Sequence, residues 1–168
     1  MESQFMKSGR EQAVLNALDQ SVLVSMTDAK GDITYVNHKF SETAKYSIDE
    51  LIGQNHRILK SGRQPNEIFV DLWKTISSGK PWRGEINNKA KDGSFYWVDA
   101  NIAPIFTEDH KISGYIAIRF LITDRKKLEE EMLEKTHNLE IMNTSMIGRE
   151  LKMVELKERI KELEEKLK

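Results

Sequence analysis

Apolar residues recur at two different intervals along the chain, and each interval predicts a kind of element. About residues 3–18 repeat apolar side chains at helical spacing, which predicts an amphipathic N-terminal helix. Two β-rich runs follow at 21–27 and 33–36, and the turn residues at 28–31 between them predict a β-hairpin. The chain is therefore expected to begin with a helix and a hairpin.

The stretch after this hairpin carries the signals of short helices. Asn37 is a suitable N-cap for the first, because its side-chain oxygen can accept a hydrogen bond from the first helical turn. Ser47 and Glu50 have the spacing of a capping box. Residues 66–78 repeat apolar side chains along one side, and the Gly-Lys-Pro sequence at 79–81 ends this helix.

Strand signals return in the following region. A strand is predicted at 82–89, and after a turn at 91–93 a long strand continues to residue 106. A further turn precedes the last strand, at 112–122. Together with the first hairpin, these strands predict a five-stranded antiparallel sheet with its helices on one side, which is an α+β fold.

The last predicted strand has two faces of different composition. One face is wholly apolar and consists of Ile116, Ile118, Phe120 and Ile122. The other is mixed and consists of Tyr115, Ala117, Arg119 and Leu121. Because a solvated face would be polar, both faces are expected to be covered. We assign the mixed face to a ligand pocket, and the apolar face to the N-terminal helix or a second subunit.

Beyond residue 124 the apolar residues follow a heptad repeat. The a positions are Met132, Leu139, Met146, Met153, Ile160 and Leu167, and the d positions are Leu128, Met142, Leu156 and Leu163. Only Lys135 and Arg149 interrupt the series, which predicts a parallel coiled-coil homodimer. The expected organisation is a cap helix at 1–19, a sheet domain at 20–124 and a coiled-coil helix at 125–168.

Composition excludes several classes of function. The net charge of −1 argues against general binding of nucleic acid or of an anionic membrane. The chain has no cysteine, so it has no disulfide, thiolate metal site or cysteine nucleophile. No apolar run approaches the length of a membrane span, and we expect a cytoplasmic protein. No nucleophile–base pair, metal cluster or phosphate loop is evident, so we do not predict an enzyme.

The candidate site lies between residues 53 and 104. This stretch holds the only tryptophans of the chain, Trp73, Trp82 and Trp97, together with several basic and amide side chains. An apolar pocket with a few convergent polar groups is the usual form of a cofactor site.

Over about residues 16–127 the chain resembles the PAS family of sensory modules, because many of its residues match that family in type and in order along the chain. The matching positions are Thr27, Asp28, Gly31, 33–37, Phe40, Tyr46, Gly53, Pro81, Trp82, Lys91, Asp92, Gly93, Tyr96, Trp97, Ala103, Pro104, Ile122, Thr123 and Asp124. The resemblance implies a PAS fold and a sensory role.

Two flavin-binding branches of that family are similar to the chain. The light-oxygen-voltage (LOV) branch carries a G-x-N-C-R-x-L run, which residues 53–59 copy with His56 in place of the cysteine. Val98 and Arg119 stand where that branch has asparagine and glutamine, so the resemblance implies a LOV-like domain without the cysteine photocycle. The FAD-binding redox branch, with the nitrogen-fixation regulator and aerotaxis sensors, shares the helix of Trp73 and the turn before Trp82.

This resemblance, together with the residue types, implies a set of flavin contacts. The candidates are Ser25, Asn55, His56, Arg57, Lys60, Arg63, Trp73, Trp82, Asn88, Val98 and Arg119. Arg57, Lys60 and Arg63 are expected near the phosphates.

The other candidates are expected around the flavin ring. Asn88 offers a donor and an acceptor to the pyrimidine edge. Trp82 is expected as a lid, and His56 as a group that changes protonation near neutral pH. Arg119, if it points inward, would favour an anionic reduced flavin.

Three hypotheses for function follow. The first is a flavin sensor, with FAD as cofactor and FMN as alternative, that detects redox state, oxygen or light. It would relay its state through the coiled coil to a histidine kinase of a two-component system or to another output module. The second is a ligand-free dimerisation module, and the third is a haem gas sensor in which His56 ligates the iron.

Overall fold

The computed structural model describes residue 13 and residues 16–166. The chain divides into two compact units, Met1–Thr123 and Asp124–Lys168. Most of the predicted N-terminal helix lies outside the described residues, and residues 16–21 are helical.

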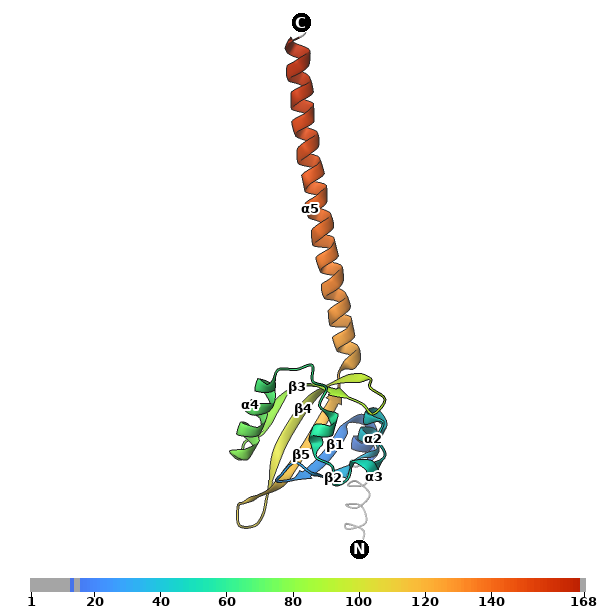
Figure 1. Ribbon diagram of the computed structural model, residues 1–168, viewed down its shortest axis with the longest axis vertical. Helices are drawn as coiled ribbons and strands as arrows, with labels where there is room; N and C mark the ends of the chain where they lie inside the picture. The colour runs from blue at the N-terminus through green and yellow to red at the C-terminus, as the bar shows by residue number, and fades with distance from the viewer. Residues whose placement is uncertain (1–12, 14–15, 167–168) are drawn as a thin grey trace. The chain divides into compact units, whose positions relative to one another are not determined.

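The first unit is built from short helices and an antiparallel sheet (Figure 1). Its strands are β1 (Leu23–Asp28), β2 (Ile33–Val36), β3 (Trp82–Lys89), β4 (Phe95–Phe106) and β5 (Ile112–Leu121). Its helices are α2 (His38–Ala44), α3 (Ile48–Leu51), the 3-10 helix η1 (His56–Leu59) and α4 (Asn66–Ser77). The helix predicted at 66–78 and the strand predicted at 82–89 agree with α4 and β3 to within a residue.

The strands lie in the order β2-β1-β5-β4-β3, and every neighbouring pair is antiparallel. The last strand of the domain is therefore its centre, because β5 pairs with β1 on one side and β4 on the other. The helices α2, α3, η1 and α4 all fall in the connection between the two edge strands, β2 and β3. The predicted five-stranded antiparallel α+β fold is confirmed.

The hydrophobic core forms between these helices and one face of the sheet. Leu23 of β1 and Val98 and Ala100 of β4 point inward from two strands, and Phe40 of α2 and Ile76 of α4 pack against that face. All five are almost completely buried. Burial of this shared face holds the connection against the sheet.

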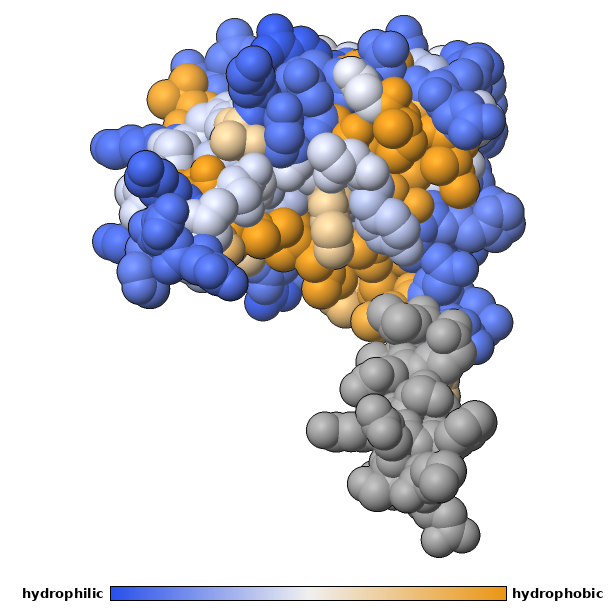
Figure 2. All heavy atoms as spheres, turned by 90° about the horizontal axis from the view of Figure 1, so that it is seen from below, coloured by the Kyte–Doolittle hydropathy of each residue, from blue (hydrophilic) through white to orange (hydrophobic). Residues whose placement is uncertain are grey.

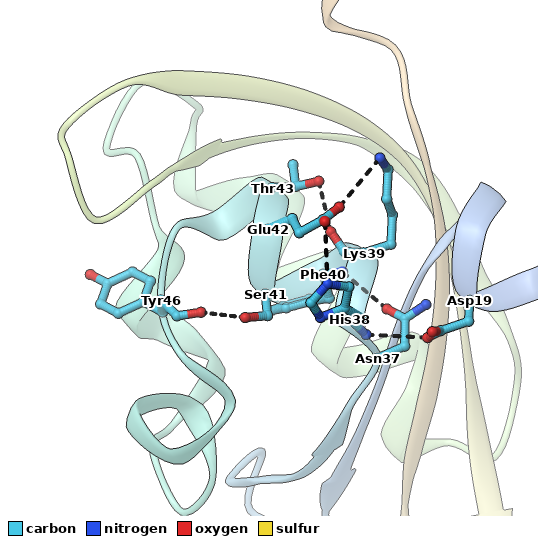
Figure 3. A network of polar contacts seen from close by, with 9 residues as sticks. All are labelled: Asp19, Asn37, His38, Lys39, Phe40, Ser41, Glu42, Thr43 and Tyr46. Atoms are coloured by element: carbon cyan, nitrogen blue, oxygen red, sulfur yellow. Dashed lines mark hydrogen bonds and ion pairs between the residues drawn. The ribbon is translucent and has the colours of Figure 1, made fainter.

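Asn37 caps α2 through Phe40 (Figure 3) and also bonds to the backbone at the start of the sheet. Its Oδ1 accepts hydrogen bonds from the backbone N–H groups of Phe40 and Val24, both at 3.0 Å. Its Nδ2 donates to the carbonyl of Val22 at 2.8 Å. The predicted N-cap is confirmed, and Asn37 also satisfies two backbone groups far from it in sequence.

The predicted capping box is present as well. Ser47 Oγ accepts from the backbone N–H of Glu50, and Glu50 Oε2 accepts from the backbone N–H of Ser47. This places α3 next to β2 and sets the start of the loop that leads to η1.

The opposite face of the sheet carries the apolar side of β5. Ile116 and Ile118 are half-buried there, and Phe120 is 57% exposed. Exposed apolar side chains gather into patches on the surface in Figure 2. That the N-terminal helix or a second subunit covers the apolar face of β5 stays a prediction, since residues 1–12 lie outside the described part of the chain.

The second unit is the long helix α5 (Thr123–Lys166). The described a and d residues are all exposed on the single chain, from 49% at Leu163 to 71% at Met132. This is the surface that a coiled coil would bury, and the coiled coil itself stays a prediction. Within the described residues, no helix combines the length and the apolar character needed to cross a membrane.

Candidate functional site

A cavity of about 310 Å³ lies between the helix-covered face of the sheet and the helices η1 and α4. Its volume is at the lower end of the range of about 300–1,000 Å³ that is typical of ligand pockets. The predicted site residues that line it are Ser25, Asn55, His56, Arg57, Lys60, Trp73, Asn88 and Arg119. The cavity is therefore large enough for a ring system, and most of the predicted residues meet around it.

The strand register explains why residues distant in sequence meet here. On β5, Tyr115, Ala117 and Arg119 alternate toward the helices, as predicted for the mixed face. Ala117 pairs with Ser25 of β1, and Arg119 pairs with the adjacent inward position, Leu23. Arg119 therefore lies in the middle of the sheet and diagonally beside Ser25.

Arg119 is the centre of a buried polar cluster and is only 3% exposed. Its Nη1 donates to Ser25 Oγ at 2.8 Å. Its Nη2 lies 3.0 Å from His56 Nε2. Because a guanidinium can only donate, this nitrogen of His56 must accept, so the neutral imidazole carries its proton on Nδ1. The Nε of Arg119 is buried and finds no hydrogen-bond partner in the described part of the chain.

The electrostatics of this cluster correct one prediction. Burial and the adjacent Arg119 charge lower the pKa of His56 to about 3. His56 therefore stays neutral near neutral pH and does not titrate there as expected from its usual value. Burial also lowers the pKa of Arg119 to about 10, which leaves the guanidinium charged at neutral pH.

Phe40, from α2, packs against both His56 and Arg119. Its ring meets the ring of His56 edge to face at 5.8 Å, and the Arg119 guanidinium carbon lies 5.6 Å from its centroid. The aromatic face gives the buried cation a partial electrostatic partner.

The more exposed part of the cavity lining is basic. Arg57 Nε donates to Asn55 Oδ1 at 2.7 Å, and Asn55 Nδ2 donates to Asp32 Oδ1 at 2.8 Å. Lys60 donates to Asn66 Oδ1 at 2.7 Å and lies over the ring of Phe69. Asn55 thus acts as a support for Arg57, which is a role that its place in the loop sequence did not indicate.

Trp73 borders the cavity from α4 and is 40% exposed. It packs edge to face against Tyr115 at 5.7 Å between ring centroids. Gly31 approaches from the turn after β1, where a Cβ would lie 3.0 Å from the Trp73 ring. Its φ of +89° also favours glycine. Trp73 is therefore part of the cavity rim and not of the core.

Three predicted site residues lie elsewhere. Arg63 stacks on Phe95, with its guanidinium carbon 3.5 Å from the ring centroid. Trp82 donates from Nε1 to Asp71 at 2.9 Å, which holds its ring between β3 and α4 instead of over the cavity. Val98 is completely buried in the core. None of the three is among the residues that line the cavity.

The apolar wall of the cavity was largely missed from sequence. It is formed by Phe69, Leu72, Ile76, Ile86 and Ile102, with Thr27 at one side. Their signal was present as the apolar side of α4 and the even-numbered positions of β3 and β4. An apolar periodicity of this kind predicts which side chains face the interior, but it does not distinguish side chains of the core from side chains that line a cavity.

Asn88 contributes from β3 to the same cavity. It is 6% exposed and is one of the residues that line the cavity. An isolated backbone bridge between Lys60 and Asn88 joins the end of η1 to β3. The amide of Asn88 therefore lies in a wall that is otherwise apolar, where it can fix the orientation of a ligand by hydrogen bonds.

The residues and geometry agree with comparisons to known proteins. The sequence model of the PAS domain family matches residues 19–125. The "Nitrogen fixation regulatory protein" of Klebsiella pneumoniae is 38% identical over 112 residues, which cover 67% of this chain and 23% of that protein. The "Aerotaxis receptor" of Escherichia coli K12 is 39% identical over 120 residues, which cover 71% of this chain and 24% of that protein.

A solved structure shares the fold. An RNA-binding light-oxygen-voltage receptor superposes with a TM-score of 0.64 at 18% identity, covering 75% of this chain and 37% of that one. The chain spans about a quarter of the length of the two curated relatives.

Proposed function

The chain belongs to the PAS domain family, and from this premise we propose that it is a flavin-binding sensor module that detects redox state. In this proposal residues 20–124 form the sensor, residues 1–19 its cap helix, and residues 125–168 a coiled coil that passes the signal to an output domain. The similarity to a nitrogen fixation regulatory protein and an aerotaxis receptor supports a sensory role.

The observation that carries the proposal is the shape and chemistry of the cavity. It combines an apolar wall suited to a planar ring with an amide, Asn88, and a buried cation, Arg119. The exposed cations Arg57 and Lys60 are suited to phosphate groups of the same ligand. A flavin nucleotide has this combination of a flat apolar ring, a hydrogen-bonding edge and phosphates.

A bound flavin would supply electron-transfer chemistry that responds to oxygen and to cellular reductants. The chain has no cysteine, so its response cannot involve a thiol adduct. Arg57, Lys60 and Asn88 would hold and orient the cofactor, and FAD and FMN both suit this set because their ring systems are the same.

The route to the output follows the strand that carries Arg119. β5 ends at Leu121, and α5 begins at Thr123. Thr123 Oγ1 accepts from the backbone N–H of Trp97 at 2.9 Å, so β4 also reaches the start of α5. A displacement at Arg119 therefore has a short covalent path to the output helix.

Two partners are proposed for the output. The first is a second copy of the chain, paired through the exposed a and d positions of α5. Burial of each large apolar side chain in that seam would stabilise the dimer by roughly 1.5–3 kcal/mol. The second is a histidine kinase or another output module beyond the coiled coil.

The other two hypotheses make different demands on the cavity. A haem sensor would need His56 free to ligate iron, whereas its Nε2 accepts from Arg119. A ligand-free dimerisation module would need the cavity filled by side chains.

The absorption spectrum of the purified chain separates these possibilities. We expect the structured blue band of a flavin, and heat should release the nucleotide for identification as FAD or FMN. A colourless protein that also fails to bind added FAD or FMN would leave the dimerisation module, and a Soret band would replace flavin by haem.

A further inference from the structure

Among the residues that the structure describes, the buried cation in the cavity, Arg119, has no negatively charged partner. The hydrogen-bond acceptors of Arg119 are Ser25, which is uncharged, and the neutral form of His56. Tyr96 faces the guanidinium from β4, but burial raises the pKa of Tyr96 to about 12 and keeps its hydroxyl neutral. Phe40 contributes only its ring face from α2.

The rest of the cavity does not supply the missing charge. Among the described residues that line it, none is an aspartate or a glutamate, whereas Arg57 and Lys60 add further positive charge. A buried charge without a partner is costly, because the low-dielectric interior does not replace the solvation that the charge has lost. The free Nε of Arg119 adds an unsatisfied donor to this cost.

We propose that the inner end of this cavity binds the ring of its ligand as an anion, with Arg119 as the counter-cation. The inference rests on the proposed flavin and states which form of its ring the chain selects. Arg119 favours uptake of two electrons and one proton, which leaves one negative charge on a neutral oxidised ring. It disfavours uptake of two electrons and two protons, which leaves none. The electrons come from a reductant such as a reduced nicotinamide.

Ser25 and His56 have a positioning role in this arrangement. Each accepts from a different terminal nitrogen of Arg119, from β1 and η1 respectively. Because both acceptors are neutral, they orient the guanidinium without cancelling its charge. The positive charge therefore remains available to the ligand, and a change in ligand charge acts directly on the contacts between β5, β1 and η1.

The number of protons taken up with the electrons is measurable in the loaded protein. The experiment is a spectroscopic redox titration of the chain with bound FMN, with dithionite as reductant, at several pH values. For a two-electron couple, one proton gives a slope of about 30 mV per pH unit and two protons about 59 mV, because a tenfold change in equilibrium constant corresponds to 29.6 mV. The pH at which the slope changes reports the pKa of the reduced ring.

The variants are Arg119→Gln, which removes the charge, and Arg119→Lys, which keeps it. Arg63→Gln is the matched control, because Arg63 is exposed and lies over Phe95 outside the cavity. We expect the slope to change at a pH at least one unit higher in Arg119→Gln than in wild type, a tenfold or greater gain in proton affinity of the reduced ring. Arg119→Lys and Arg63→Gln should stay near wild type.

Free FMN in the same buffers gives a comparison that does not depend on the folding of any variant. The bound wild-type ring should lose its second proton at a lower pH than free FMN. An unchanged or higher pH in the wild-type protein, or equal values in wild type and a folded Arg119→Gln, would overturn the inference while leaving flavin binding intact. A wild-type chain that binds no FMN or FAD would remove the proposed function and this inference together.

Discussion

His56 gives the sharpest test of the buried cluster, through the pH dependence of stability. Its pKa is about 3 in the folded chain, against 6.5 for an unperturbed histidine. Between these values the unfolded chain binds a proton that the folded chain does not, so stability rises with pH in this window and is constant above it. Acidification from pH 7 to about pH 5 should therefore destabilise the flavin-free protein.

The size of this effect follows from linkage. For one proton bound only in the unfolded state, lowering the pH from about 7 to about 5 costs about 2 kcal/mol of unfolding free energy. With a urea m-value of about 1–3 kcal/mol/M, the midpoint should fall by about 1 M. Asp28, Glu50 and Asp92 also have lowered pKa values in the folded chain, but they affect stability at lower pH. The stabilisation that their carboxylates contribute is lost only as the pH falls below about 4.5.

The assay is urea unfolding of the flavin-free chain at fixed protein concentration, followed by tryptophan fluorescence. Trp73, Trp82 and Trp97 all lie in the first unit, so the signal reports the sheet domain and not α5. His56→Gln should remove the loss between pH 7 and 5, because glutamine can still accept from Arg119 but takes up no proton. His38→Gln on the exposed surface of α2 is the matched control and should keep the loss. If His56→Gln loses as much stability as wild type, His56 is not held neutral by the fold.

Three further perturbations test other parts of the structure. Replacing Leu156 and Ile160 with charged residues should give monomers by light scattering, since both lie in the predicted seam; a double mutant that stays dimeric would mean that the sheet face holds the dimer. Asn37→Ala should lower the unfolding free energy by about 3 kcal/mol in urea, because three backbone groups lose their partner, and a loss below about 1 kcal/mol would contradict this role. Gly84→Ala should cost about 1–3 kcal/mol by the same measurement, since a Cβ there would lie 2.5 Å from the Trp82 ring, and an unchanged midpoint would show that the ring moves freely.

The sequence by itself determined the features that depend on local chemistry and on period. Alternation of apolar residues placed the five strands, and the caps at Asn37 and Ser47 placed the starts of two helices. The order of short motifs was sufficient to recognise the family, and alternation alone put Arg119 on the mixed face of β5. These features can be predicted from sequence because each depends on neighbours within a few residues or on a strict two-residue repeat.

Only the tertiary structure decided which candidates share the cavity. Arg63 and Trp82 have the right chemistry and nearly the right place in the chain, but Phe95 and Asp71 offer them other partners. Nothing local in the sequence shows such competing contacts, because each is set by the packing of one element on another.

The charge state of the cluster was also a tertiary result. Ser25 and Arg119 are 94 positions apart, and η1 brings His56 onto both of them. A residue type supplies only an ordinary pKa, whereas burial and the distance to the nearest charge set the real one. Those quantities exist only after β1, β5 and η1 have packed together, and this is why the sequence placed His56 in the site but assigned it the wrong protonation behaviour.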